Sequence, residues 1–296
     1  MRIAAFAFAC VGLIATLTFA EAAPEQRVVS FSVEGLKIVG TLELPEAVKN
    51  APVVLLLHGF TGKRDELAIP SANNQGIFAR AADAWAKAGF ASLRIDFRGS
   101  GDSEGSYADT TISDQIKEAL AATDFLQNEK DVDASRLYVV GWSQGGTVAT
   151  AVAGRSAHPI KAVALWAPAS NPAATFAAFL GVDYLKEGLA SGGKAVTKKL
   201  PWGADVSLKT PFFEDLYNID PPAELAHYSG PVFVAVGTND PIVNPQPAMG
   251  QLLLTYHKGP GELWVRPMDH SFNSFQNVET VDALIAATQA FMEKNK

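Results

Sequence analysis

Hydrophobic and polar residues alternate in two early segments of the chain and then give way to short, continuous apolar runs. Residues 27–33 and 37–44 alternate around a Glu-Gly pair at 34–35, which predicts an antiparallel hairpin with one solvent-facing side. The later apolar runs are typical of strands that are buried on both faces. These runs are residues 53–57, 91–95, 137–140, 162–166, 232–236 and 263–265.

Helical segments lie between most of the predicted strands. We expect helices over residues 76–88, 111–128, 144–154, 247–256 and 278–294. Strands that alternate with helices in this way favour right-handed crossovers and a mainly parallel sheet. The pattern therefore predicts an α/β fold in which helices flank both faces of the sheet.

The interval between the strands at 162–166 and 232–236 is much longer than an ordinary connection. We interpret residues 171–230 as a cap, inserted after the sixth strand over the carboxyl edge of the sheet. A peripheral subdomain that packs away from any functional site is the alternative. The interval has enough large apolar residues for a small core of its own, namely Phe176, Phe179, Tyr184, Leu185, Trp202, Phe212, Phe213 and Tyr217.

Composition and charge exclude several classes of protein. The 296 residues are 48% hydrophobic and 19% charged, which is ordinary for a globular chain with one large α/β domain or two small ones. The formal net charge of −7 argues against a nucleic-acid partner, because phosphate binding requires a clustered basic surface. The one basic patch, residues 194–199, is interpreted as a solvated loop.

The sequence contains no convincing motif for a bound cofactor or metal. The Gly-Ser-Gly sequence at 99–101 follows a predicted strand, but Glu104 stands where a dinucleotide-binding loop has its third glycine. No cluster of histidine, cysteine and carboxylate residues in the sequence has the spacing of metal ligands. We therefore expect no cofactor and no metal.

The N-terminus has the pattern of a secretory signal peptide. A Met-Arg pair precedes an apolar stretch over residues 3–20, and Ala20-Glu21-Ala22 matches a small-x-small cleavage site. An uncleaved membrane anchor is the alternative. We expect a signal peptide over 1–22 and a mature domain over 23–296, secreted or periplasmic, with no stable membrane insertion after cleavage. The single cysteine, Cys10, lies in the predicted signal peptide, so the mature chain has no disulfide.

A serine lies between glycines where a strand is expected to end and a helix to begin. Residues 141–146 read Gly-Trp-Ser-Gln-Gly-Gly and separate an apolar run from a run of small residues. Small neighbours allow such a serine to adopt a sharp, strained turn from which its hydroxyl group protrudes. The sequence thus predicts that Ser143 is a nucleophile.

A base and an acid are expected at the same edge of the sheet. His270 follows the last predicted strand, whereas His158, His227 and His257 are better explained as surface or packing residues. Asp240 comes just after the strand at 232–236, where loops after parallel strands gather ligands, although a turn-forming role beside a proline is open. Asp269 is a poorer candidate, because its neighbour in sequence is His270 itself.

The loop after the third strand is the candidate for stabilising an oxyanion. It reads His-Gly-Phe-Thr-Gly at 58–62, and backbone N–H groups in such a loop are suited to bind developing negative charge. We expect the two donors to be the N–H groups of Phe60 and of Gln144, the residue after the serine. His58 either holds this loop by hydrogen bonds or is a plain residue at a strand end.

Together with the Asp-Phe-Arg-Gly-Ser-Gly-Asp-Ser segment at 96–103, these motifs resemble the α/β-hydrolase superfamily. Within it they are most similar to bacterial cinnamoyl/feruloyl esterases and related carboxylesterases. The resemblance extends from about Val28 to the C-terminus. It implies the α/β-hydrolase fold and a catalytic triad of Ser143, Asp240 and His270, in that family's chain order.

The resemblance also implies a reaction and a class of substrate. We expect a serine carboxylic ester hydrolase that forms an acyl-enzyme on a small-molecule ester, such as a hydroxycinnamate, with the cap choosing the acyl group. Aromatic residues of the cap either stack on an aromatic acyl group or form the cap's own core. The candidates for substrate contact are His58, Tyr184, Trp202 and Phe213.

Two other functions are consistent with the same motifs. A serine peptidase or an acyltransferase would keep the triad and change the leaving group or the acceptor; Glu187, Glu214 and Asp215 are the carboxylates available to hold a peptide's amino terminus. A non-catalytic binding protein on a hydrolase scaffold is the other. It would usually lack a member of the triad, whereas all three candidates are present in this chain.

Overall fold

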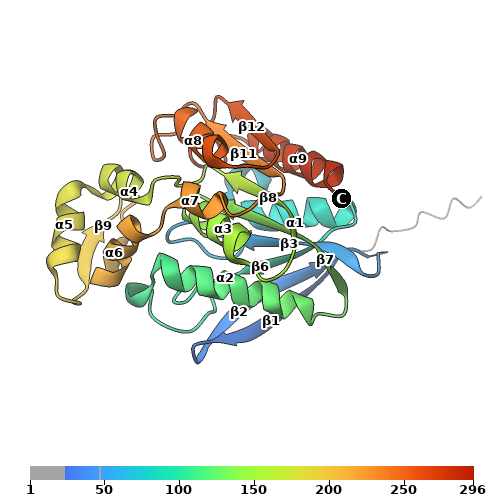
Figure 1. Cartoon of the computed structure of the whole chain (residues 1–296), viewed down its shortest axis with the longest axis horizontal. Coiled ribbons are helices and arrows are strands. Elements are labelled where there is room, and N and C mark those ends of the chain that lie inside the picture. The colour runs from blue at the N-terminus through green and yellow to red at the C-terminus, as the bar shows by residue number, and fades with distance from the viewer. Residues whose placement is uncertain (1–23, 47) are drawn as a thin grey trace, which may run out of the picture.

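An eight-stranded sheet organises the chain, and helices cover both of its faces (Figure 1). The computed structural model describes residues 24–46 and 48–296, so the predicted signal peptide, residues 1–22, lies outside the described residues. The strand order is β1-β2-β6-β3-β7-β8-β11-β12. The strands are β1 (Glu25–Val33), β2 (Leu36–Leu44), β3 (Ala51–Leu57), β6 (Ala91–Ile95), β7 (Val132–Trp142), β8 (Ile160–Trp166), β11 (Val232–Gly237) and β12 (Gly261–Arg266).

The sheet is mainly parallel, as the apolar runs predict. β1 and β2 form the expected antiparallel hairpin, and β2 also pairs antiparallel with β6. Every other pair of neighbouring strands in this sheet is parallel. All residues of β3, β6 and β11 are buried, whereas residues of β1 alternate between exposed and half-buried positions. Continuous apolar runs thus mark β3, β6 and β11 as strands covered on both faces. The run at 263–265 is an exception, because it lies in β12 at the edge of the sheet, where every residue is half-buried or exposed.

Alternate residues of the central strands point into two separate cores. In β3, Val53 and Leu55 belong to the core beneath α2, α3 and α8, whereas Val54 and Leu56 belong to the core beneath α1 and α9. The predicted helices are present with small shifts at their ends. They are α1 (Ile77–Lys87), α2 (Ile112–Gln127), α3 (Gln144–Arg155), α8 (Ala248–Tyr256) and α9 (Glu279–Lys294).

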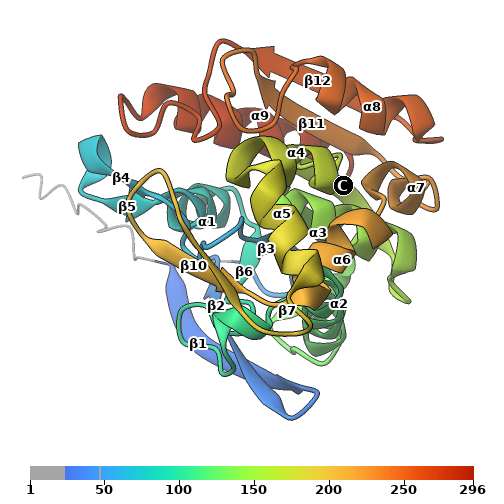
Figure 2. The same ribbon diagram turned by 90° about the vertical axis from the view of Figure 1, so that its left-hand side faces the viewer.

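The residues between β8 and β11, 171–230, form a separate group of elements that we call the insert. It contains α4 (Pro172–Leu180), α5 (Val182–Ala190), β9 (Val196–Lys199), β10 (Asp205–Leu208), α6 (Thr210–Asn218) and α7 (Pro221–Leu225). Most of the insert lies at one end of the strands, at the left of Figure 1 and toward the viewer in Figure 2. α7 returns to the main body, where it packs against α3 and α8.

The sequence pattern missed the short elements. β9 and β10 form an antiparallel hairpin. Part of the basic patch at 194–199, which we interpreted as a loop, is therefore a strand. Because three of the four residues of β9 are exposed, this strand has no apolar run in the sequence. β4 (Ala68–Ile69), β5 (Gln75–Gly76) and two 3₁₀ turns, η1 (Pro70–Ala72) and η2 (Tyr107–Asp109), are too short to show a period. Across 24–46 and 48–296, no helix combines the length and apolar character needed to cross a bilayer.

Leu55 provides a test of the core beneath α2 and α3. Because Leu55 is completely buried in the central strand β3, Leu55→Ala should lower the free energy of unfolding by about 2–5 kcal/mol through lost apolar contact and a residual cavity. Val28→Ala, on the exposed part of β1, is the control and should change it by less than about 0.5 kcal/mol. Urea denaturation followed by tryptophan fluorescence measures both; equal effects would contradict the assigned core.

Candidate active site

Ser143 occupies a sharp turn between β7 and α3. Its φ of 54° and ψ of −117° are unusual for a residue with a side chain, and such strain persists only where surrounding contacts impose it. The Ser143 N–H donates to the carbonyl oxygen of Trp166 at 2.9 Å, and its own carbonyl oxygen accepts the N–H groups of Gly146 and Ala169, both at 3.0 Å. The turn is therefore held by backbone hydrogen bonds on both sides.

Two glycines of the motif are required because backbone segments approach each other closely. A Cβ atom on Gly145 would lie 2.0 Å from the carbonyl oxygen of Leu57 at the end of β3. A Cβ atom on Gly141 would lie 2.2 Å from the carbonyl oxygen of Gly145. The first turn of α3 consequently packs directly against the backbone of the sheet.

Ser143, His270 and Asp240 form a continuous hydrogen-bonded chain. His270 Nε2 is 2.9 Å from Ser143 Oγ, and His270 Nδ1 is 2.8 Å from Asp240 Oδ2. Asp240 is fully buried at its side chain, and its Oδ1 accepts the N–H groups of Ile242 and Val243 at 2.8 and 2.9 Å. The structure thus brings together the three residues that the sequence selected from different loops.

Asp269 has a different position from Asp240. Its Oδ1 accepts the N–H groups of Ser271 at 2.9 Å and Asn273 at 2.8 Å. The carboxylate therefore shapes the loop that contains His270, and among the described residues Asp240 alone places a carboxylate on the imidazole ring.

Trp142 is a neighbour of His270 that the sequence reasoning did not select. The centres of the two rings are 5.5 Å apart, and the indole N–H of Trp142 donates to the carbonyl oxygen of His270 at 3.2 Å. The sequence could have indicated this neighbour, because Trp142 directly precedes Ser143 and a large side chain at that point of the turn must lie beside the nucleophile. Trp142 thus helps to hold the imidazole in line with Ser143.

The loop at 58–62 lies against Ser143 and presents an unused N–H group. A Cβ atom on Gly59 would lie 3.4 Å from Ser143 Cβ. Within this loop Gly59 N–H donates to Glu66 Oε1, Thr61 N–H to the Tyr107 hydroxyl oxygen and Gly62 N–H to the Gly59 carbonyl oxygen. Among the described residues no protein group accepts the N–H of Phe60 or of Gln144. These two donors are the pair that the sequence predicted.

His58 holds the loop from inside the protein and does not reach the cavity beside Ser143. Its Nε2 accepts the N–H of Phe97 at 3.1 Å, so the proton is on Nδ1, which donates to the Gly59 carbonyl oxygen at 2.9 Å. Burial lowers the pKa of His58 to about 4, which keeps the ring neutral. His58 is therefore removed from the candidates for substrate contact, and its loop-holding interpretation matches the geometry.

The segment at 96–103 holds the same loop from the end of β6. Asp96 accepts the backbone N–H of Arg64 at 2.7 Å and the N–H of Asp102 at 2.9 Å, and it forms an ion pair with the Arg64 guanidinium group. A Cβ atom on Gly101 would lie 2.1 Å from Asp96 Oδ2. Gly101 thus makes room for a carboxylate of the protein itself, whereas Gly99 allows the close approach of the backbone at Ser106 and Tyr107. The sequence did not reveal this role because Asp96 and Arg64 are far apart along the chain.

An apolar cavity of about 590 Å³ opens beside Ser143 and His270. Loops of the sheet edge and residues of the insert both line it; its aromatic walls are Phe60, Trp142, Phe176, Phe179, Trp202 and Phe275. Trp202, a predicted contact residue, lines the cavity and stacks on Phe179, with ring centres 5.9 Å apart.

The two remaining candidates for substrate contact lie elsewhere. Tyr184 and Phe213 are buried against each other inside the insert, 5.3 Å between ring centres, and the Tyr184 hydroxyl group donates to the carbonyl oxygen of Val196. They form the core of the insert and do not line the cavity beside Ser143, which corrects the expectation for both. An aromatic pattern on short helices does not reveal which face points toward a cavity.

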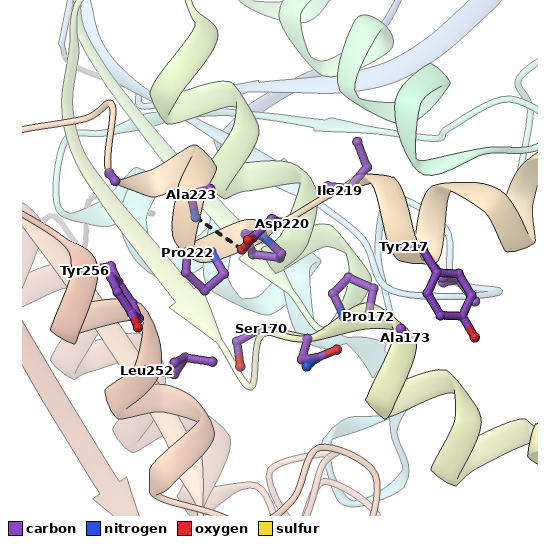
Figure 3. A pocket seen from close by; sticks show the side chains of 14 residues that line it. Ser170, Pro172, Ala173, Tyr217, Ile219, Asp220, Pro222, Ala223, Leu252 and Tyr256 are labelled. Atoms are coloured by element: carbon purple, nitrogen blue, oxygen red, sulfur yellow. Dashed lines mark hydrogen bonds between the residues drawn. The ribbon is translucent and has the colours of Figure 1, made fainter.

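A second cleft lies where the insert joins the main body (Figure 3). It has a volume of about 570 Å³ and shares no residue with the cavity beside Ser143. Pro172 comes from the outgoing end of the insert, and Ile219 and Pro222 come from the returning end. Asp220 accepts the N–H of Ala223 at 3.3 Å and so caps α7. Within residues 24–46 and 48–296, no group of three or more histidine, cysteine or carboxylate side chains is arranged to hold a metal.

Comparisons with known proteins agree with this architecture. A family model for the alpha/beta hydrolase fold matches residues 52–205, more than half of the chain. A structure of Est1E from Butyrivibrio proteoclasticus with ferulic acid bound is similar, with a TM-score of 0.74 and 22% identity over 90% of this chain and 98% of that one. The esterase domain of a Rhodothermus marinus protein has a TM-score of 0.67 and 22% identity over 91% and 98% of the two chains.

One sequence relative gives a shorter match. It is an uncharacterized 31.7 kDa Escherichia coli protein from the traX-finO intergenic region, 29% identical over 113 residues. The match includes 38% of this chain and 35% of the other, so this chain spans about a third of the length of the curated relatives it matches.

Gly145→Ala tests the close approach of α3 to β3. The added Cβ meets a backbone oxygen that cannot rotate away, so the free energy of unfolding should fall by about 1–3 kcal/mol. Gly261→Ala is the matched control, because its Cβ would meet only a methyl group of Leu254. Chemical denaturation of both variants measures the difference, and a loss no greater for Gly145→Ala than for the control would contradict the packing described.

Proposed function

The chain belongs to the family of proteins with the alpha/beta hydrolase fold, and from this premise we propose that it is a serine hydrolase of carboxylic esters. The observation that carries the proposal is the hydrogen-bonded chain from Ser143 through His270 to Asp240. It ends at an apolar cavity in which an acyl group has room. Similar architecture in esterases supports the same reading.

In the proposed reaction, Ser143 Oγ attacks the ester carbonyl carbon while His270 Nε2 accepts its proton. Asp240 accepts a hydrogen bond from Nδ1–H and stabilises the imidazolium ion that forms. The N–H groups of Phe60 and Gln144 donate to the oxyanion of the tetrahedral intermediate. The C–O bond to the alcohol then breaks, and the alcohol leaves with the proton from His270.

Water completes the cycle. His270 accepts a proton from a water molecule whose oxygen attacks the acyl-enzyme, and the same two N–H groups bind the second oxyanion. Collapse of this intermediate releases the carboxylic acid and returns the proton to Ser143 Oγ.

We propose an aromatic or other apolar acyl group as the preferred substrate part, and a cap role for the insert. Phe176, Phe179 and Trp202 of the insert line the cavity opposite the sheet-edge loops, and aromatic faces of this kind favour stacking on a flat ring. Est1E, a protein of the same fold, has been solved with ferulic acid bound. These observations support a hydroxycinnamate-type ester.

The geometry favours an ester over a peptide. Of the three carboxylates that the sequence offered as anchors for a peptide's amino terminus, none lines the cavity beside Ser143. Asp215 accepts the N–H and hydroxyl groups of Ser113 at 2.6 and 3.0 Å, so it is already engaged within the protein. The cavity lining is mainly apolar, and neither Glu187 nor Glu214 nor Asp215 reaches it, which suits an uncharged acyl group better than a charged amino terminus.

Three substitutions test the proposed reaction. Ser143→Ala should lower kcat on methyl ferulate by on the order of 10⁶, and Asp240→Asn by on the order of 10⁴ because the imidazole loses its orienting carboxylate. Asp269→Asn, which alters the same loop without touching the imidazole ring, is the matched control and should keep kcat within about tenfold of wild type. Steady-state hydrolysis and fluorophosphonate labelling measure these effects. A Ser143→Ala enzyme that keeps more than about a hundredth of the wild-type rate would refute the mechanism.

Trp202→Ala tests the proposed acyl preference. Loss of an aromatic wall should reduce kcat/KM for methyl ferulate by about threefold to tenfold, while hydrolysis of p-nitrophenyl acetate, whose acyl group is too short to reach the wall, stays near wild type. Tyr256→Ala removes an equally exposed aromatic residue outside the cavity and serves as the control. An equal loss on both esters would argue against a contact between Trp202 and the acyl group.

A further inference from the structure

Glu66 is a buried carboxyl group that the proposed reaction does not use. Its residue is only 6% exposed, and its backbone has a φ of 60°. Oε1 accepts the N–H of Gly59 at 2.7 Å. Among the described residues, Oε2 is buried and has no hydrogen-bond partner. Burying a carboxyl oxygen without a hydrogen-bond partner costs free energy. The surroundings of Glu66 must therefore explain why it is buried.

The carboxyl group fills the inside of the loop that presents Phe60. Gly59 directly precedes Phe60, and a Cβ atom on Gly62 would lie 2.2 Å from Glu66 Oε1. On the other side of the loop, the Tyr107 hydroxyl oxygen accepts the N–H of Thr61 at 2.8 Å. Glu66 therefore holds the His58–Gly59 peptide group and Tyr107 holds the Phe60–Thr61 peptide group. Between them, the Phe60 N–H donates to no protein group among the described residues.

We propose that Glu66 is a positioning residue for oxyanion binding, which holds the Gly59 N–H so that the Phe60 N–H faces Ser143. The carboxyl group acts in this role in its uncharged form. This inference rests on the proposed function, because it assigns a role within the same site. The uncharged form matters because a negative charge beside the loop would oppose the oxyanion that forms on the substrate.

Burial favours the uncharged form of Glu66 and outweighs the N–H groups of Gly59 and Leu67, which favour the charged form. Burial raises the pKa of Glu66 to about 8, and within residues 24–46 and 48–296 no basic side chain forms an ion pair with it. Arg64, on the same loop, pairs with Asp96 and Asp102. Glu66 lines both the cavity beside Ser143 and a neighbouring cleft that Lys63 and Asp205 also line. The other titratable groups that face Glu66 or line these two spaces are His58, Lys63, Asp65, Tyr107, Asp205, Asp269 and His270.

These neighbours leave the loop with little compensating charge. His58 is neutral because burial depresses its pKa, and Tyr107 is neutral because burial raises its pKa. Asp65 pairs with Arg94 at 3.1 Å. Ionisation of Glu66 above about pH 8 would therefore add a buried negative charge next to the Phe60 peptide group. Activity should fall as the pH rises through that range.

Glu66→Gln separates the charge from the hydrogen bond. Its amide oxygen keeps an acceptor for the Gly59 N–H but never ionises. We expect wild-type kcat to fall about tenfold per pH unit above about pH 8, and the kcat of Glu66→Gln to stay level from neutral pH to about pH 10. Glu66→Ala, which loses the acceptor, should lose about tenfold or more in kcat with little change in KM.

Asp65→Asn is the matched control, because it neutralises the adjacent carboxylate, which contacts Arg94 and not the oxyanion loop. It should keep the wild-type alkaline decline. The inference is overturned if Glu66→Gln shows the same decline as wild type, if Glu66→Gln is inactive at neutral pH, or if Glu66→Ala has wild-type kcat. If Glu66→Ala does not fold, the pH dependence of kcat for Glu66→Gln alone tests the proposed role of Glu66.

The rate of Ser143 labelling by a fluorophosphonate, measured over the same pH range, keeps this inference distinct from the proposed function. Phosphonylation places an oxygen in the same oxyanion site but requires no ester turnover. If wild type is labelled and hydrolyses no ester, the proposed ester hydrolysis fails, and the labelling rates of wild type and Glu66→Gln still decide the role of Glu66. Equal alkaline declines in labelling would refute that role.

Discussion

The contact between the first turn of α3 and the end of β3 is the constraint on which the site depends. Gly145 lies so close to the carbonyl oxygens of Leu57 and His58 that a Cβ atom would be 2.0 and 2.5 Å from them. Leu57 begins the loop that presents Phe60, and Gly145 follows Gln144. One backbone contact therefore lies between the Phe60 and Gln144 N–H groups that we propose as oxyanion donors. The strained turn at Ser143 lies beside the same contact, between the end of β7 and the start of α3.

Burial and pairing distribute charge around this contact. Asp240 is paired with His270, and Asp96 with Arg64, so these carboxylates have compensating donors. His58 and Glu66, which hold the Phe60 loop from within, have burial as the main influence on their pKa values, and both are shifted toward the neutral form. The negative charge of the proposed intermediate thus forms next to uncharged polar groups. In such surroundings preorganised N–H groups stabilise an oxyanion most effectively.

The sequence predicted the parts of the fold and the site that local patterns determine. Continuous apolar runs identified β3, β6 and β11 because these strands are covered on both faces. Ser143, Asp240 and His270 were selected because each follows a strand at one edge, and the structure brings them together.

Features that depend on distant partners were not predictable in the same way. The pairing of Asp96 with Arg64 and the position of Glu66 inside the Phe60 loop arise only after folding. Tyr184 and Phe213 were misplaced because an aromatic residue in the insert fills either its core or the cavity wall, and the sequence pattern is the same for both.

The joined ends of the insert have a consequence for how proteins of this architecture diversify. Pro172, where the insert begins, and Pro222, where it returns, line one cleft. The insert therefore leaves the main body and rejoins it at nearly the same place. A segment of another length or sequence can close the same gap without moving β8 or β11. The insert can therefore be exchanged as a unit while Ser143, His270 and Asp240 keep their positions at the sheet edge.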